Sequence, residues 1–410
     1  MKTRKEPTKR AASPAMQSAL RHALAVALAA LMMAASLALG GCATQAPSAD
    51  TPAGTQADAP ANTAADDTRA DAPAVDTMDD RSFTDMAGRE VTVPGLGALE
   101  RVYFTGFPAE IYCLTLAPEL AGGTSSDGYT EAELELLPAG TRDLRYLGTL
   151  SGGKELNPES ILEADIQLIV SVAFDDPAES DKTQADDLQA QTGIPVAVFS
   201  GNLDRVQEVY AELGRLLGRE DEAATLGAYC AEKLAAVKAA VATVPESERV
   251  SLYYAEGPEG LQTEPESSSH ALTFKVAGAK NVADVEAAGG KGMSNTSLEQ
   301  VIAWDPQVII AWDDVVRGGA DERIRTDSNW APVKAVRDGR VYTMPNVPYS
   351  WCDRPPSVNR FLGIQWVANL LYPDAYDVDM VQETRDFYRL FYHVDIDAAK
   401  AKEILGNSAG

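Results

Sequence analysis

Histidine is scarce in this sequence, which has only three among its 410 residues. They are His22, His270 and His393. A Zn²⁺ or Mn²⁺ site built from several imidazoles is therefore excluded unless carboxylates replace the missing ligands, because His22 falls in a basic N-terminal segment. No Ser-His-Asp, Cys-His or paired-carboxylate pattern of a catalytic site is recognisable either. We therefore expect no enzyme activity, since a hydrolase or a metal-cluster reductase would need such a set.

Cysteine is also rare, with four residues. Cys42 lies near the N-terminus, and the others are Cys113, Cys230 and Cys352. These three allow one disulfide at most, and none of them has the spacing of a metal ligand. We interpret Cys113 and Cys230 as buried thiols.

Positive charge is outnumbered, because 35 Lys and Arg residues face 61 Asp and Glu residues for a net charge of −26. Residues 1–41 hold six basic residues and one acidic residue, so the rest of the chain is more acidic still. Such a protein does not bind nucleic acid or an anionic membrane through bulk charge. An anionic ligand would need a local basic pocket.

The N-terminal segment has the pattern of an export signal. Basic residues precede an apolar run over about residues 23–39, slightly short for a membrane-spanning helix. The run ends in Leu39-Gly40-Gly41-Cys42, which resembles the lipobox of bacterial lipoprotein signals. We predict a signal over residues 1–41 and lipidation of Cys42, with an ordinary secretory signal or an uncleaved anchor as the alternative. Residues 42–81, rich in Ala, Thr, Pro and Asp, are predicted to be a disordered tether.

One stretch of sequence occurs twice, at residues 157–170 and 297–310. Aligned without a gap, the copies share Glu159 with Glu299, Asp165 with Asp305, Gln167 with Gln307, and Ile169 with Ile309. Each copy begins with a helix-capping residue, continues as a short helix with the Glu in its first turn, and ends in a buried parallel strand. Two such units in one chain predict two similar lobes.

Strands alternate with helices on both sides of the longest helical pattern, residues 221–241. This order is typical of βαβ units around parallel sheets, so we predict an α/β protein with two Rossmann-like lobes. We expect an N-terminal lobe at 82–218, an inter-lobe helix at 219–245, a C-terminal lobe at 246–372 and a helical tail at 373–410. Within these, a helix is expected at 355–371, and residues 379–405 are expected to be helical. The stretch 148–155 imitates a phosphate-binding loop, but Glu155 stands where a hydroxyl is required, so we interpret it as a turn-rich loop.

Several short motifs then follow one another in a recognisable order. They are Thr84-Asp85-x-x-Gly88-Arg89-x-Val91-x-Val93-Pro94, Asn157-x-Glu159 before a strand, Gly193-Ile194-Pro195-Val196, the long helix, the second Glu-containing strand unit, and Gly339-Arg340-Val341-Tyr342. This series resembles the periplasmic-binding family that serves ABC importers of ferric siderophores, haem and corrinoids. The resemblance covers about residues 82–372. It implies two α/β lobes joined by one long helix, with a ligand in the cleft between them.

The resemblance also implies a docking surface. Glu159 and Glu299 match the two carboxylates, one on each lobe, that dock onto arginines of the permease. A rigidly placed pair of charges fixes orientation and speeds encounter. The alternative is that both residues merely favour the start of a helix.

Ligand contacts are expected in the loop 345–357. Tyr349 and Trp351 offer aromatic surface there, and Arg354 offers bidentate contact to carboxylate or catecholate oxygens. The alternative is a packed loop in which Arg354 pairs with Asp353 or another acid.

The resemblance also implies a metal-coordinating role for His270 and Tyr349. His270, after an acidic and serine-rich loop, is implied to complete iron coordination together with Tyr349. Its alternative role is that of a surface or N-capping residue. Tyr129 lies on the corresponding loop of the N-terminal lobe.

These expectations combine into one function. We predict an extracytoplasmic, lipid-anchored substrate-binding protein that captures an Fe(III) complex, above all a ferric siderophore, and delivers it to the permease dimer of an ABC importer. It is expected to be a monomer, with no cofactor and no nucleic-acid partner. Because histidine is scarce, the ligand should be a chelate or an oxyanion rather than a free ion. Haem, a corrinoid, a nickel chelate, molybdate or tungstate are the alternative ligands, and a sensor or adhesion domain is the alternative function.

Overall fold

A computed structural model describes residues 77–150, 156–288, 293–313 and 318–408. The predicted signal, Cys42 and most of the predicted tether lie outside these ranges, as do residues 151–155 of the turn-rich loop. All described residues belong to one compact unit of the chain. Within the described ranges, no helix combines the length and the apolar character needed to cross a bilayer.

The N-terminal lobe begins with an antiparallel hairpin of β1 (Arg81–Thr84) and β2 (Glu90–Val93). Its core is a parallel sheet in the order β3 (Val102–Thr105), β4 (Leu168–Val172) and β5 (Val196–Phe199). The strands are almost entirely buried, because helices cover both faces of the sheet. The helices of this lobe are α2 (Phe107–Leu116), α3 (Glu131–Leu134), α4 (Pro158–Glu163), α5 (Glu179–Thr192) and α6 (Val206–Leu217).

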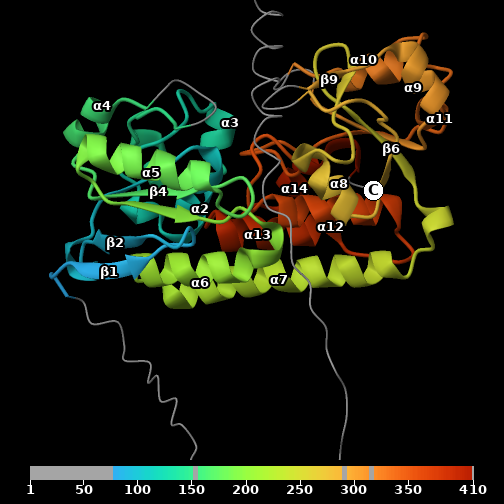
Figure 1. Cartoon of the computed structure of the whole chain (residues 1–410). Coiled ribbons are helices and arrows are strands. Elements are labelled where there is room, and N and C mark those ends of the chain that lie inside the picture. Colours follow the sequence, from blue (N-terminus) through green and yellow to red (C-terminus); the bar gives the residue numbers. More distant parts are fainter. Residues whose placement is uncertain (1–76, 151–155, 289–292, 314–317, 409–410) are drawn as a thin grey trace, which may run out of the picture. The chain divides into compact units, whose positions relative to one another are not determined.

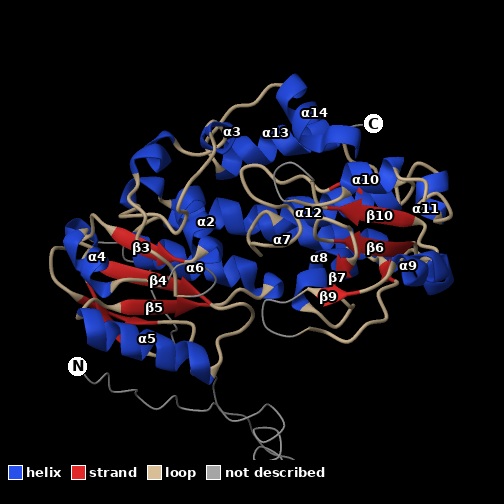
Figure 2. Cartoon of the chain, turned by 90° about the horizontal axis from the view of Figure 1, so that it is seen from above, coloured by secondary structure: helices blue, strands red, loops and turns tan. Residues whose placement is uncertain are grey.

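The C-terminal lobe repeats this plan with four parallel strands (Figure 2). Their order is β11 (Val341–Thr343), β10 (Val308–Ala311), β6 (Ser251–Ala255) and β8 (Lys280–Asn281). A small antiparallel pair is formed by β7 (Gln262–Thr263) and β9 (Ser294–Asn295). The helices of this lobe are α8 (Leu272–Val276), α9 (Leu298–Trp304), α10 (Asp321–Thr326), α11 (Lys334–Arg337) and α12 (Arg360–Leu371).

The long helix α7 (Glu220–Ala242) joins the lobes and confirms the predicted architecture (Figure 1). Its buried positions include Ala223, Leu226, Cys230, Leu234, Val237 and Val241, which recur every three or four residues. This apolar stripe packs on α6 of the N-terminal lobe and on α12 of the C-terminal lobe. A single rigid helix of 23 residues therefore holds both lobes.

The duplicated sequence performs the same structural task in both lobes. Asp165 and Asp305, directly at the ends of α4 and α9, both adopt the left-handed conformation, with φ of 53° and 43°. Gln167 then accepts a hydrogen bond from the backbone N–H of Arg101 at 2.9 Å, and Gln307 accepts one from the N–H of Ser251 at 2.9 Å. Each copy thus joins its helix end to the start of the neighbouring parallel strand.

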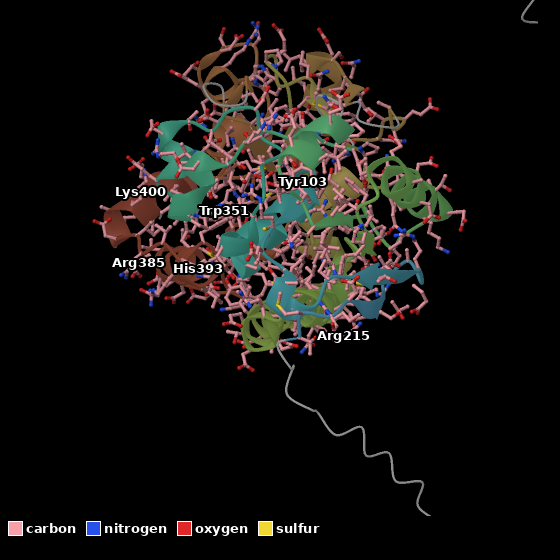
Figure 3. The ribbon with its side chains drawn as sticks, turned by 90° about the vertical axis from the view of Figure 1, so that its left-hand side faces the viewer. Tyr103, Arg215, Trp351, Arg385, His393 and Lys400 are labelled. Atoms are coloured by element: carbon pink, nitrogen blue, oxygen red, sulfur yellow. The ribbon has the colours of Figure 1, made fainter. Side chains whose placement is uncertain are left out.

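The predicted helical tail over 379–405 consists of two helices, α13 (Met380–Phe391) and α14 (Ala398–Leu405). It contacts both lobes. His393 lies 3.2 Å from the carbonyl oxygen of Thr115 in α2, and the ring of Phe391 lies 6.4 Å from that of Tyr210 in α6. Tyr388 donates a hydrogen bond to Val347 in the C-terminal lobe. Figure 3 shows Trp351 in the interior and Arg385 and Lys400 of the tail at the edge of the molecule.

The tertiary structure corrects one local expectation and confirms another. The helix expected at 355–371 begins only at Arg360, because residues 355–359 form an irregular loop. Cys113 and Cys230 are buried free thiols as expected, and Cys352 is a third.

The loop before α12 is held against the helix at Gly363. A Cβ atom at this position would lie 1.9 Å from the carbonyl oxygen of Trp351. We expect Gly363→Ala to lower the free energy of unfolding by about 3 kcal/mol, because two backbone segments would have to separate. Urea unfolding measures this loss. The control is Gly140→Ala, where a Cβ meets nothing within 4 Å. A loss at Gly363 no larger than at Gly140 would contradict this packing.

Candidate functional site between the lobes

The candidate site lies where the three parallel strands of the N-terminal lobe end. Ligands of α/β proteins bind at the carboxyl ends of such strands. A cavity of about 180 Å³ lies here, between the residues that follow β3, β4 and β5 and the start of α12 in the C-terminal lobe. A second cavity of about 240 Å³ shares Phe174, Asn202 and Arg360 with the first and extends to Lys238 on α7. Phe174 and Arg360 therefore stand between two small cavities of the inter-lobe cleft.

Arg360 is the central charged group of this cleft. Its side chain is only 3% exposed, and its Nε and Nη2 atoms have no hydrogen-bond partner among the described residues. Its guanidinium carbon lies 5.8 Å from the centre of the Phe174 ring. Burial lowers the pKa of Arg360, and the nearby Asp353 opposes this effect. Both nitrogen atoms are themselves buried. A buried guanidinium with unpaired donors is suited to bind an anion.

The local sequence explains why Arg360 is so firmly placed. Pro355 and Pro356 lack a backbone N–H, and the helix begins only after them, at Arg360. The side chain of Asn359 donates a hydrogen bond to the carbonyl oxygen of Tyr349 at 3.1 Å and accepts one from Tyr392 at 2.6 Å. Arg360 therefore begins α12 at the end of a loop that is bonded on both sides.

A cluster of buried ionisable groups lies behind Arg360. Asp353 is fully buried and its Oδ1 atom lies 2.8 Å from Nδ1 of His270. Arg354 pairs with Glu256 at 3.0 Å and with Asp353 at 3.4 Å, and it also donates to Glu264. Burial raises the pKa of Glu256 to about 8, although Arg354 opposes the shift. Arg354 is thus paired with acidic side chains of the protein itself.

Two tyrosines connect the lobes beside this cluster. The hydroxyl groups of Tyr129 and Tyr349 lie 2.5 Å apart, and Tyr129 donates to Glu110 at 2.7 Å. Burial raises the pKa of Glu110, although hydrogen bonds from Thr124, Tyr129 and Ser125 oppose it. The chain from Tyr349 through Tyr129 to Glu110 forms a direct hydrogen-bonded link between the two lobes.

The structure brings the expected ligand residues into two groups. One is the Tyr129–Tyr349 pair, and the other is His270 and Arg354 around Asp353. Trp351 is fully buried and belongs to neither group. The described lining of the two cavities contains none of these five ligand candidates. Their contact with a ligand stays a prediction.

His270 and Tyr349 are the two residues that were expected to coordinate iron. His270 and Tyr349 are bonded to different partners, Asp353 and Tyr129. The ring of His270 also packs edge-on against Phe174, with 5.3 Å between ring centres. Within the part of the chain that the structure describes, no three His, Cys, Asp or Glu side chains are grouped so as to hold a metal ion.

Sequence reasoning did not select Arg360 or Phe174. Arg360 is the only charged residue in the helix Arg-Phe-Leu-Gly-Ile-Gln-Trp-Val-Ala-Asn-Leu-Leu. A lone cation at the start of an otherwise apolar helix was the available signal. Phe174 lies two residues after the end of β4 yet is 45% exposed. Its signal was weaker, because an aromatic residue after a strand is commonly core.

The two glutamates expected to dock a permease are both exposed at helix starts. The N–H of Glu159 donates to the capping residue Asn157 at 2.9 Å. In the other lobe, the capping residue Ser297 accepts from Gln300 at 3.2 Å. Hydrogen bonds from its own backbone N–H and from Ser297 lower the pKa of Glu299. Both carboxylates are therefore accessible and held by capped helices.

Comparison with known proteins agrees with this architecture. The sequence matches the periplasmic binding protein family over residues 122–348. The solved ABC transporter solute binding protein of Sulfurospirillum deleyianum is 30% identical, with a TM-score of 0.71, and the similarity covers 79% of this chain and 98% of that one. The structure of MolA from Haemophilus influenzae bound to molybdate has the same fold, at 23% identity and a TM-score of 0.58, covering 78% of this chain and 99% of that one.

The sequence of the molybdate-binding protein MolA from Haemophilus influenzae is similar over a shorter stretch. It is 38% identical over 125 residues, which are 30% of this chain and 33% of that protein. The chain therefore matches about a third of the length of this curated relative.

The raised pKa of Glu256 predicts a stability that falls with increasing pH. The folded protein keeps this proton to about pH 8, whereas the unfolded chain releases it near 4.5. Between these values the folded state binds more protons, so the free energy of unfolding decreases as pH rises. Glu256→Gln removes this contribution.

We therefore expect the stability of the wild-type protein, measured relative to Glu256→Gln, to fall by on the order of 2 to 4 kcal/mol between about pH 5 and pH 8. Urea unfolding of both proteins at the two pH values measures the difference. Parallel pH dependences of the two proteins would contradict the assignment.

Proposed function

Because the chain belongs to the periplasmic binding protein family, whose members serve ABC importers, we propose that it captures a small oxyanion of the molybdate class at Arg360 and delivers it to a permease. The observation that carries this proposal is the buried guanidinium in the inter-lobe cleft with two nitrogen atoms that form no hydrogen bond to any described residue. The protein as a whole is strongly acidic and repels anions. A buried local cation is the feature that an anion-binding cleft in such a protein requires.

The size of the cleft supports a small ligand. The two cavities measure about 180 and 240 Å³, below the roughly 300–1,000 Å³ of sites for drug-sized molecules. A tetrahedral oxyanion fits this scale and can accept hydrogen bonds from Nε and Nη2 of Arg360 at once. The side chains of Ser357 and Asn202 line the same cavity and offer further polar contacts.

A ferric siderophore, the ligand that the sequence favoured, is the second candidate. Many such complexes are anionic, so Arg360 would also attract them. The structure supports this ligand less, because His270 and Tyr349 already bond to Asp353 and Tyr129. The cavities of about 180 and 240 Å³ are also below the roughly 300–1,000 Å³ of sites for drug-sized ligands.

Titration calorimetry distinguishes the candidates. We expect molybdate or tungstate to bind the wild-type protein, and Arg360→Gln to weaken this binding by about 30- to 1,000-fold, because a buried charged hydrogen-bond partner is lost. Ferric siderophore, haem, cobalamin and nickel-histidine are titrated in parallel. Arg142→Gln is the control, because Arg142 pairs only with the exposed Glu131. Binding of a siderophore but of no oxyanion would overturn the proposal in favour of the second candidate.

We also propose that Glu159 and Glu299 dock the permease, and that lipidated Cys42 anchors the protein to the outer face of a membrane. The exposed, capped positions of the two carboxylates support the docking role. One negative charge on each lobe suits a permease dimer that presents two cationic surfaces.

Reversing both charges tests the docking surface. We expect Glu159→Arg with Glu299→Arg to reduce ligand uptake by cells at least about tenfold, because charges opposite like charges repel across an interface. Ligand binding by the purified variant should not change. The control reverses two exposed acids elsewhere, Glu246→Arg with Asp374→Arg. Uptake equal to that of the control would remove the docking assignment.

A further inference from the structure

We infer that His270 is a positioning residue that holds Asp353 away from Arg360, so that the donors of Arg360 stay available to the ligand. The inference rests on the proposed function, because it concerns the same anion site. His270 does not line either cavity of the cleft in the described structure, so it acts through Asp353 rather than by contact.

The distances around Asp353 carry the argument. Its Oδ1 atom lies 2.8 Å from Nδ1 of His270 but 4.0 Å from Nη2 of Arg360. A carboxylate and a guanidinium that are free to meet normally form bonds of about 2.7–2.9 Å. Here both groups are buried and adjacent, yet they do not bond. The oxygen that faces Arg360 is the one that His270 already binds.

Other contacts hold Asp353 from the opposite side. Arg354 lies 3.4 Å from its Oδ2 atom, and the hydroxyl of Ser350 accepts from its backbone N–H at 3.2 Å. Arg354 is itself held by Glu256 and Glu264. Among the described residues that line the two cavities, Asp353 is absent.

The consequence for Arg360 is electrostatic. A buried cation without a counter-charge is costly, so an uncompensated Arg360 would move toward water or toward another acid. Asp353 at 4.0 Å supplies the compensating charge and opposes the lowering of the pKa of Arg360 by burial. It does so without occupying Nε or Nη2. The site is thereby charged and still able to donate to an anion.

His270 is itself fixed by its surroundings. Its backbone N–H donates to the hydroxyl of Ser268 at 3.2 Å, and its ring meets Phe174 edge-on. Because a carboxylate accepts hydrogen bonds, Nδ1 carries the proton that points at Asp353. The ring of Phe174 contacts both His270 and Arg360, so the same aromatic side chain packs against the positioning residue and against the proposed ligand-binding cation.

A set of variants separates positioning from direct ligand contact. His270→Leu removes the donor and should weaken molybdate binding about tenfold, because the freed Oδ1 of Asp353 then bonds to Arg360. His270→Asn keeps a donor near the position of Nδ1 and should restore most of the affinity. In the Asp353→Asn background, His270→Leu should have no further effect. His393→Gln, at the only other described histidine, is the control.

The outcomes are distinct. Weakening by His270→Leu that persists in the Asp353→Asn background would mean that His270 contacts the ligand, and the inference would fall. Unchanged molybdate binding in His270→Leu, together with a loss in Arg360→Gln, would overturn the inference alone. Unchanged binding in Arg360→Gln would overturn the proposed function itself.

A measurement on the wild-type protein tests the same inference if one of the variants does not fold. Nitrogen-15 NMR of labelled histidine should show the Nδ1–H signal of His270, hydrogen-bonded to Asp353, unchanged at saturating molybdate. Loss of that signal on molybdate binding would contradict the positioning role.

Discussion

The described structure depends on one constraint. The positive charge of a buried guanidinium must be balanced by an acid, while some of its N–H donors remain without a hydrogen bond to the protein. Arg360 lies at the junction of the lobes with less than a tenth of its surface exposed. Asp353 balances its charge from 4.0 Å, and a loop fixed by Asn359 and by the Gly363–Trp351 contact holds both groups in place. Satisfying all donors within the protein would be the usual solution for a buried charge. Leaving two of them unpaired at a cavity is the arrangement expected of a binding site.

The rest of the fold holds the two lobes together at that junction. Helix α7 packs on both lobes, and α13 contacts α2, α7 and α12, so the lobes are joined by more than a loop. The Tyr129–Tyr349 link crosses the cleft and ends on the buried Glu110. Lobes joined in this way move by small rotations rather than by wide opening. The exposed Glu159 and Glu299 lie on α4 and α9, one on each lobe.

The sequence predicted more of the fold than of the site. The duplicated Asp and Gln residues, the 3.6-residue stripe of α7 and the alternation of strands and helices are local patterns, and each led to the correct element. The start of α12 was misplaced by five residues, because Pro355 fits both a helix start and a loop. Arg354 and Arg360 are separated by only six positions, and nothing local distinguishes their roles. Their difference comes from Glu256 and Glu264, which lie 98 and 90 residues before Arg354 and bond to it rather than to Arg360.

The sequence by itself determined the class of protein: two similar α/β lobes, a long connecting helix, an exposed acid on each lobe and too few histidines for a multi-imidazole metal site. These properties follow from composition and from patterns shorter than a helix. Only the tertiary structure decided which cation faces the cleft and which is neutralised within the core. That choice depends on burial and on partners brought together from distant strands and loops, and a buried charge takes its character from its neighbours rather than from its own side chain.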